Sequence, residues 1–341
     1  MRIFKRFGLY ALCVMLAVAA LSAALIVPWL RTPADSHDQA LRDALAGQLD
    51  TLIIGQSYAM NGIMPEKLDE RLGTRAYNLS GSLMPLYGQK YMLQKELART
   101  PVQSVIIEIT PDTFTSDEGM TYGNGDSYVV ARLDSLSERL HYMIRYVQPS
   151  DWINIYARML MLSMRSAAYR LLGQAELIDE AHRGFIPLKA QDVSADPDWA
   201  RAYHKSMSIF NEPRQENIRE YEELIELCRQ AGCDVTIVYT PVSHVKVWEL
   251  YDQDVFLGWA RELAQAHGVP LFDFNLLKSR YELFSDRTSF SDNNHLSGEG
   301  AEVFSEAMAD VLARYRAGED VSPLFYASYE EVIHDSVYWG R

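Results

Sequence analysis

The chain contains few cysteines and no surplus of basic residues. Its three cysteines among 341 residues are too few for a disulfide framework, and their spacing does not match a zinc site. A local disulfide bond between Cys228 and Cys233 remains an alternative to two free thiols. Cys13 lies in an apolar run. The 46 acidic and 32 basic residues give a formal net charge of -14, which argues against nucleic acid and an anionic membrane surface as partners. The composition favours a neutral substrate or a protein partner, and we expect no metal ion and no cofactor.

Charge is missing altogether from one long stretch near the N-terminus. Residues 8–30 carry no charged side chain over twenty-three positions, which is long enough to span a bilayer. Arg2, Lys5 and Arg6 precede this stretch, and such a basic flank stays in the cytoplasm. The sequence therefore predicts a single-pass inner-membrane protein whose residues after Arg31 lie outside the cytoplasm, in the periplasm where the cell has two membranes. A cleaved signal peptide is the alternative, but the apolar run continues well past its small residues, which favours a retained anchor.

The rest of the chain alternates short apolar runs with helical patterns. The runs predict buried parallel strands at residues 52–54, 75–79, 104–109, 234–239 and 270–274. Helices are expected between and after them, at residues 64–72, 85–99, 215–231, 255–267 and 298–315. Right-handed crossovers and this strand count predict an α/β fold with a doubly wound, flavodoxin-like parallel sheet in the order 2-1-3-4-5.

A long connection between the third and fourth strands predicts a mainly helical insertion. We divide the chain into an anchor at 1–30, a tether at 31–49, an α/β domain at 50–319 with the insertion at 113–211, and an aromatic tail at 320–341. Helices are expected at 128–147 and 151–172, and the second is apolar around most of its circumference. We interpret it as a lid packed on the core, with docking on a membrane partner or the bilayer surface as the alternative. The tail aromatics are expected to pack against the domain.

Two loops carry the residue types of a catalytic triad. Ser57 directly follows the first strand, and ligands of open parallel sheets bind beyond the carboxyl ends of the strands. Asp292 and His295 precede the last helix with two residues between them. Because a serine hydroxyl needs a base and the base needs an orienting group, we predict Ser57 as nucleophile, His295 as base and Asp292 as its partner. His244, after the fourth strand, is the rival base or a substrate-binding residue.

These motifs resemble those of the SGNH hydrolase superfamily. Gly55-Gln56-Ser57 stands where that family has Gly-Asp-Ser, and Asp292-x-x-His295 matches its last motif. Residues 78–82 look like the second motif, so the resemblance implies that Gly81, with Ser82 beside it, serves the oxyanion hole or substrate binding. The third motif, Gly-x-Asn, is missing. The chain has Asp112 in this region, and an ionised carboxylate there would repel an oxyanion.

A membrane-anchored SGNH-like domain with a long insertion is similar to D-alanyl-lipoteichoic acid biosynthesis proteins and alginate O-acetylation proteins. The resemblance implies a serine O-acyltransferase that acetylates an envelope or secreted polysaccharide through an acyl-serine, beside a membrane-bound O-acyltransferase. A carbohydrate esterase (deacetylase) of the same fold and a noncatalytic domain that binds glycan or a partner remain alternatives. Glu108, within the third strand, and the pair Asn293-Asn294 are interpreted as structural.

Overall fold

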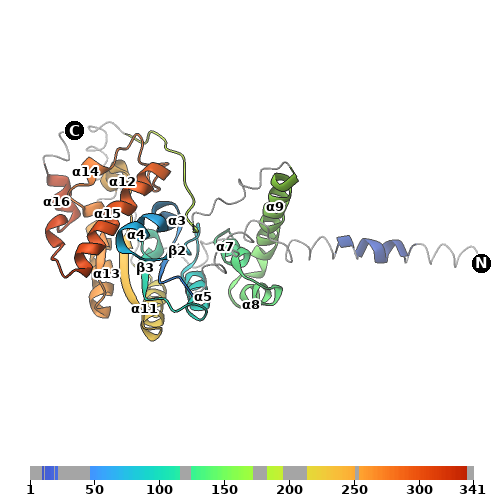
Figure 1. Cartoon of the computed structure of the whole chain (residues 1–341). Coiled ribbons are helices and arrows are strands. Elements are labelled where there is room, and N and C mark those ends of the chain that lie inside the picture. Colours follow the sequence, from blue (N-terminus) through green and yellow to red (C-terminus); the bar gives the residue numbers. More distant parts are fainter. Residues whose placement is uncertain are drawn as a thin grey trace, which may run out of the picture.

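A five-stranded, all-parallel sheet forms the centre of the computed structural model, with helices on both faces (Figure 1). The structure describes residues 10, 12–18, 20–21, 47–115, 124–171, 183–194, 213–249 and 253–335. The strands are β1 (Thr51–Ile54), β2 (Ala76–Asn78), β3 (Ser104–Glu108), β4 (Asp234–Tyr239) and β5 (Leu271–Asp273). Their order, β2-β1-β3-β4-β5, confirms the predicted doubly wound, flavodoxin-like sheet.

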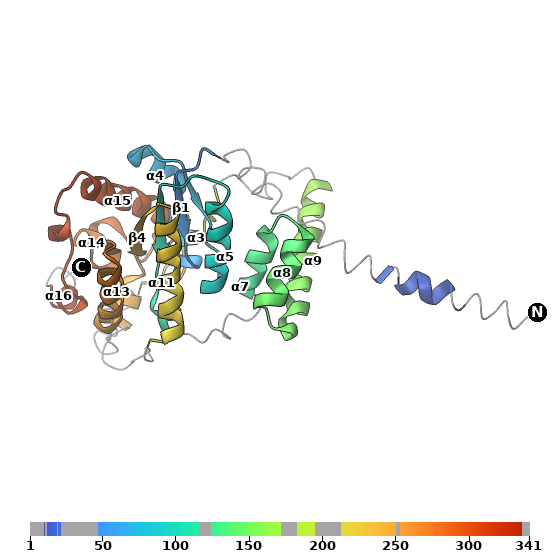
Figure 2. The ribbon, with the colours of Figure 1, turned by 90° about the horizontal axis from the view of Figure 1, so that it is seen from below.

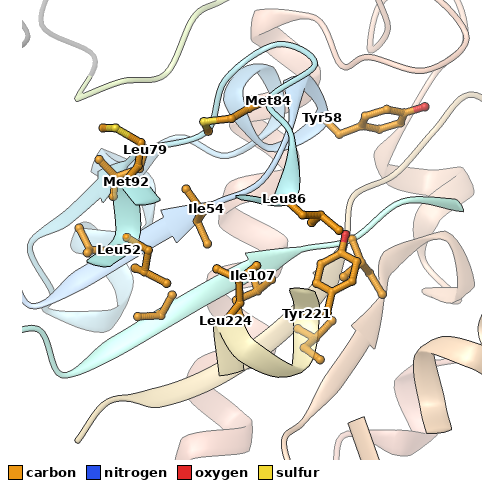
Figure 3. Packing of buried hydrophobic residues seen from close by; sticks show 14 of the residues in the cluster. Leu52, Ile54, Tyr58, Leu79, Met84, Leu86, Met92, Ile107, Tyr221 and Leu224 are labelled. Atoms are coloured by element: carbon orange, nitrogen blue, oxygen red, sulfur yellow. The ribbon is translucent and has the colours of Figure 1, made fainter. Parts of the chain in front are cut away.

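The strands are continuous apolar runs because both of their faces are covered. Successive side chains of β1 point to opposite faces, so Ile53 and Ile54 belong to different apolar clusters. Ile54 lies opposite Ile107 of β3 and packs with Leu224 on one face (Figure 3). Ile53 and Phe304 belong to the cluster on the other face.

The helices form one layer on each face of the sheet. The elements outside the insertion are α3 (Ser57–Gly62), α4 (Pro65–Leu72), α5 (Leu86–Leu97), α6 (Pro111–Thr115), α11 (Gln215–Gln230), α12 (His244–Glu249), α13 (Gln253–His267), α14 (Arg280–Leu283), α15 (Gly298–Arg316) and α16 (Tyr329–His334). Helices α5, α11 and α13 supply the cluster that contains Ile54, whereas α3, α4 and α15 supply the cluster that contains Ile53. The five predicted helices outside the insertion are therefore present, as α4, α5, α11, α13 and α15. The short helices α3, α6, α12, α14 and α16 were not predicted from the pattern.

The insertion contains α7 (Asn124–Arg132), α8 (Leu136–Tyr146) and α9 (Trp152–Leu171), which lie beside α5 (Figure 2). The single helix predicted at 128–147 is wrong, because Ser135 starts a new helix. Its hydroxyl accepts the backbone N–H of Glu138, whose carboxylate accepts the backbone N–H of Ser135. Helix α9 packs chiefly against α7 and leaves Ile153 and Met161 exposed. Its buried side chains Ile155 and Met159 belong to the cluster that contains Ile54, so α9 packs on the core beside α7 and does not lie directly on the sheet.

A buried carboxyl group ties the insertion to α5. Asp126 of α7 accepts hydrogen bonds from the hydroxyl of Tyr142 in α8 at 2.7 Å and from that of Tyr87 in α5 at 3.0 Å. Burial raises the pKa of Asp126 to about 6, although both hydroxyl groups oppose this shift. Hydrogen bonds from α5 and α8 thus converge on one acid of α7.

The described part of the tail packs on the domain, as expected. Phe325 lies against Phe272, with ring centroids 6.1 Å apart, and the hydroxyl of Tyr329 donates to Asp273 at 2.6 Å. Tyr338 and Trp339 lie outside the described residues.

Two other expectations concern cysteines and the membrane. Cys228 and Cys233 are buried free thiols, so the local disulfide bond is not formed, and burial raises the pKa of Cys228 to about 12. Most of the predicted anchor at 8–30 and most of the tether at 31–49 lie outside the described residues. Within the part that the structure describes, no helix combines the length and apolar character needed to cross a membrane.

Candidate active site

The predicted nucleophile lies at the carboxyl end of β1. The strand ends at Ile54, the chain turns at Gly55 and Gln56, and Ser57 is the first residue of α3. The turn rests on Glu108 of β3, whose Oε2 accepts the backbone N–H of Gln56 at 2.8 Å. A Cβ atom at Gly55 would lie 2.5 Å from the same Oε2, so the turn requires glycine here.

The structure brings the three predicted triad residues together. Nε2 of His295 lies 2.8 Å from Oγ of Ser57, although the two residues are 238 positions apart. Nδ1 of His295 lies 2.9 Å from both carboxylate oxygens of Asp292. The carboxylate of Asp292 can only accept a hydrogen bond, so the proton is assigned to Nδ1 of His295. Nε2 is then free to accept the hydroxyl proton of Ser57. The arrangement matches a nucleophile, a base and an orienting group.

Asp292 is held by its own turn. Its Oδ1 accepts the backbone N–H of Asn294 at 2.7 Å and that of His295 at 2.9 Å. Burial acts to raise the pKa of Asp292, but the hydrogen bond and charge of His295, together with these two N–H groups, outweigh it and hold the pKa below its usual value. The carboxylate is therefore ionised at neutral pH and fixed beside the imidazole.

Tyr58 completes the surroundings of the base. Its ring centroid lies 5.1 Å from that of His295, with the planes tilted by 43°. Burial, and then the charges of Asp112, Glu108 and Asp292, raise the pKa of Tyr58 well above its usual value. A neutral phenol thus lies against the imidazole. The sequence analysis missed this residue because an aromatic side chain after a strand looks like ordinary core.

Of the groups expected to bind an oxyanion, only some are positioned to do so. In the described part of the chain, the backbone N–H of Ser57 makes no hydrogen bond, and it belongs to the same residue as the nucleophile. The Gly81 N–H instead donates to the carbonyl of Gly55 at 3.3 Å, a long bond that has to open before Gly81 can serve an oxyanion. Ser82 is half-buried on the turn that follows Gly81, and Asp112 is exposed on α6. No side-chain donor takes the place of the missing third motif among these residues.

His244 has a carboxylate partner that its sequence neighbours did not reveal. Its backbone N–H donates to Oδ1 of Asp286 at 3.0 Å, and its Nδ1 lies 3.2 Å from the same oxygen. The ring stacks on Tyr281 at 4.5 Å, and burial lowers the pKa of His244 against the opposing effect of Asp286. Because the hydroxyl of Ser57 faces His295, the geometry favours His295 as base over His244.

One end of the insertion borders the second motif. The guanidinium of Arg132, at the end of α7, donates to the carbonyl oxygens of Leu79 at 2.7 Å and Ser80 at 2.9 Å. Tyr128, one turn earlier, lies against Gly81. Helix α7 therefore supports the loop that follows β2.

The other end of the insertion, residues 183–194, here called the return segment, borders the nucleophile helix and the last loop. The backbone N–H of Ile186 donates to the carbonyl of Met60 at 3.0 Å, and the side-chain amide of Asn61 donates to the carbonyl of Ile186 at 2.7 Å. The backbone N–H of Gly298 donates to the carbonyl of Leu188 at 2.8 Å. The return segment therefore links α3 to the start of α15, directly after the triad loop.

Comparisons with known proteins add no relative. The sequence matches no protein-family model, and no curated protein matches it. Within the described residues, no three histidine, cysteine, aspartate or glutamate side chains are grouped in a way that would hold a metal ion.

Proposed function

We propose that the protein is an SGNH-like serine O-acyltransferase that transfers an acyl group, acetyl by resemblance, to an envelope or secreted polysaccharide. The observation that carries this proposal is the continuous hydrogen-bonded series from Ser57 through His295 to Asp292. Such a series activates a serine for attack on an acyl carbon.

The proposed reaction has two steps that use the same base. Oγ of Ser57 attacks the acyl carbonyl carbon of the donor while Nε2 of His295 takes the hydroxyl proton, and this proton then leaves with the departing donor oxygen or sulfur. A sugar hydroxyl next attacks the acyl-serine and gives its proton to Nε2. Collapse of this second intermediate releases the acylated sugar and returns the proton to Oγ. Asp292 stabilises the imidazolium that forms in both steps.

The insertion favours transfer over hydrolysis in this proposal. A transferase has to keep its acyl-serine until a sugar hydroxyl arrives, which requires an acceptor groove and some exclusion of water. Helix α7 and the return segment border the site on two sides, through Arg132 and Ile186. A hydrolase needs no such border. The esterase and the noncatalytic binding domain therefore remain the alternatives that an experiment has to separate.

The resemblance also supplies the proposed setting. We place the domain in the periplasm, held at the inner membrane by the apolar stretch at 8–30. A membrane-bound O-acyltransferase would deliver the acyl group, and a polysaccharide would accept it.

The test uses an activated acetyl ester as donor and oligosaccharides as acceptors. We expect slow hydrolysis alone, faster donor consumption with the right oligosaccharide, and acetylated sugar by mass spectrometry.

Ser57→Ala should abolish turnover of the donor and also the acetyl-serine adduct on the protein, because it removes the attacking oxygen. Asp292→Asn should lower kcat about 100-fold or more, because it disturbs the tautomer of His295. Ser322→Ala changes an exposed serine away from the triad and is the matched control.

The outcomes separate the three functions. Rapid polysaccharide deacetylation without any transfer product would establish the esterase. Glycan binding with neither an acyl-enzyme nor turnover would establish the binding domain. Full activity of Ser57→Ala would show that Ser57 is not the nucleophile.

A further inference from the structure

A buried acid lies directly beneath the turn that presents Ser57. Glu108 is the last residue of β3 and is 1% exposed. Its Oε2 accepts the backbone N–H of Gln56 at 2.8 Å, and its Oε1 has no hydrogen-bond partner among the described residues. Gly55 is required because any side chain there would collide with this carboxyl group. The carboxyl group of Glu108 therefore both bonds the turn and restricts Gly55 to glycine.

Among the described residues, no cation acts on Glu108 to stabilise its charged form. The titratable groups that act on it or are acted on by it are Tyr58 of α3, Asp112 of α6, Tyr221 of α11 and Tyr239 of β4. Burial raises the pKa of Glu108 to about 8; the N–H of Gln56 opposes this shift and the charge of Asp112 adds to it. The acid is consequently neutral at and below pH 7.

We propose that Glu108 is a positioning residue that holds the Gln56–Ser57 turn as a neutral acid, and that its ionisation turns the site off. This inference rests on the proposed acyl transfer at Ser57. It replaces the interpretation of Glu108 as a merely structural strand residue.

The N–H of Gln56 belongs to the planar peptide that joins Gly55 to Gln56, so its bond to Glu108 holds this peptide in place one residue before the nucleophile. The φ and ψ of Gln56, -99° and -157°, then set the direction of the Ser57 N–H, the uncommitted donor next to the nucleophile. A neutral carboxyl group accepts the Gln56 N–H without adding negative charge. An ionised Glu108 still accepts it, but its charge opposes the negative charge that develops on the substrate oxygen. The two forms of Glu108 thus share a geometry and differ in their effect on the transition state.

Two substitutions separate geometry from charge. Glu108→Gln keeps an acceptor oxygen and cannot ionise, whereas Glu108→Leu removes the acceptor. The control is Asp273→Asn, which alters another buried acid, one that binds Tyr329 and whose pKa burial raises to about 6.

The readout is the rate at which a fluorophosphonate labels Ser57, followed from about pH 6 to about pH 10, together with kcat on an acetyl ester. In labelling, Oγ displaces fluoride at phosphorus and its proton passes to His295, so no acceptor or partner is needed. We expect the wild-type rate to fall as the pH rises through about 8. Glu108→Gln should keep its rate above that pH, and Glu108→Leu should be about tenfold slower or worse at every pH, with KM little changed. Asp273→Asn should follow the wild-type profile.

The outcomes distinguish this inference from the proposed function. A wild-type protein that is never labelled overturns acyl transfer at Ser57 itself. A wild-type protein that is labelled but shows no fall at high pH, or a Glu108→Gln profile that superimposes on it, overturns the role of Glu108. The wild-type profile decides the question of ionisation even where Glu108→Leu does not fold.

Discussion

At the scale of single residues, Glu108 shows how one strand position serves both stability and the site. Its carboxyl group is buried, no described residue places a cation beside it, and burial raises its pKa to about 8 from an ordinary value of 4.5. The folded state therefore binds this proton more tightly than the unfolded state does. The stabilising contribution is complete below pH 4.5, and it is lost as the pH rises from there to about 8.

We expect Glu108→Gln to remove this pH dependence, because an amide does not titrate. The wild-type free energy of unfolding should decline relative to that of the variant by about 1 kcal/mol per pH unit across this window. Urea unfolding of both proteins at pH 5 and pH 8 measures the difference. Asp126 and Asp273, whose pKa values are also raised, are common to both proteins and cancel. Parallel pH profiles would show that Glu108 does not change its protonation on unfolding in this range.

At the scale of elements, the sequence predicts best what depends on local pattern. Continuous apolar runs identified the five strands, and the rule that carboxyl ends of parallel strands share one edge predicted that Ser57 and His295 meet. The break between α7 and α8 was missed, because an apolar pattern does not register a capping box at Ser135. Helix α3 was missed because its six residues are buried on every side and show no period.

The contacts that refine the site depend on register and packing, which the sequence does not display. The bond from Gln56 to Glu108 joins residues 52 positions apart, and the bonds of Arg132 to the second motif depend on where the insertion folds. His244 finds Asp286 at a separation of 42 positions. Each partner is an ordinary polar residue in the sequence, and only the folded chain makes it part of the site.

The return segment carries a prediction at this scale. Gly184 has a φ of +85°, and a Cβ atom there would overlap the carbonyl oxygen of Asn78 in β2. Gly184→Ala therefore combines left-handed strain with a backbone collision, and we expect a loss of about 3 kcal/mol in the free energy of unfolding. Gly73 is the matched control, since its φ is +67° with no atom within 4 Å, and Gly73→Ala should cost about 1 kcal/mol.

Chemical unfolding of the two variants provides the measurement. Labelling of Ser57 should also slow in Gly184→Ala and stay unchanged in Gly73→Ala, because the return segment binds α3 through Asn61. Equal losses of stability in both variants would show that the return segment moves aside freely and does not brace the site.

At the scale of the whole molecule, the insertion reaches the site through its ends and not through its longest helix. Arg132 of α7 and the return segment contact the loops around Ser57, whereas α9 packs chiefly on α7 and keeps Ile153 and Met161 exposed. A cover formed by these ends leaves α9 available for the alternative suggested by its sequence, contact with a membrane partner or the bilayer surface.

The order of charge along the chain sets the proposed orientation in the membrane. Arg2, Lys5 and Arg6 precede the uncharged stretch, and basic residues of this kind stay on the cytoplasmic side. The residues of the tether, at 31–49, can span at most about 70 Å when extended. The α/β domain, and with it Ser57, would then work close to the outer face of the bilayer, where a membrane-bound acyl donor would be within reach.

We therefore expect that a reporter fused after Arg341 is active only if that reporter works outside the cytoplasm. Alkaline phosphatase should be active in this position, and β-galactosidase should be inactive. Replacing Arg2, Lys5 and Arg6 with glutamate should reduce the phosphatase signal, because the positive flank that fixes the orientation is lost. Membrane fractionation of the unmodified chain separates a retained anchor from a cleaved signal peptide, since cleavage would release the domain and shorten it. Strong β-galactosidase activity of the fusion would place Ser57 in the cytoplasm and would rule out transfer to a polysaccharide outside it.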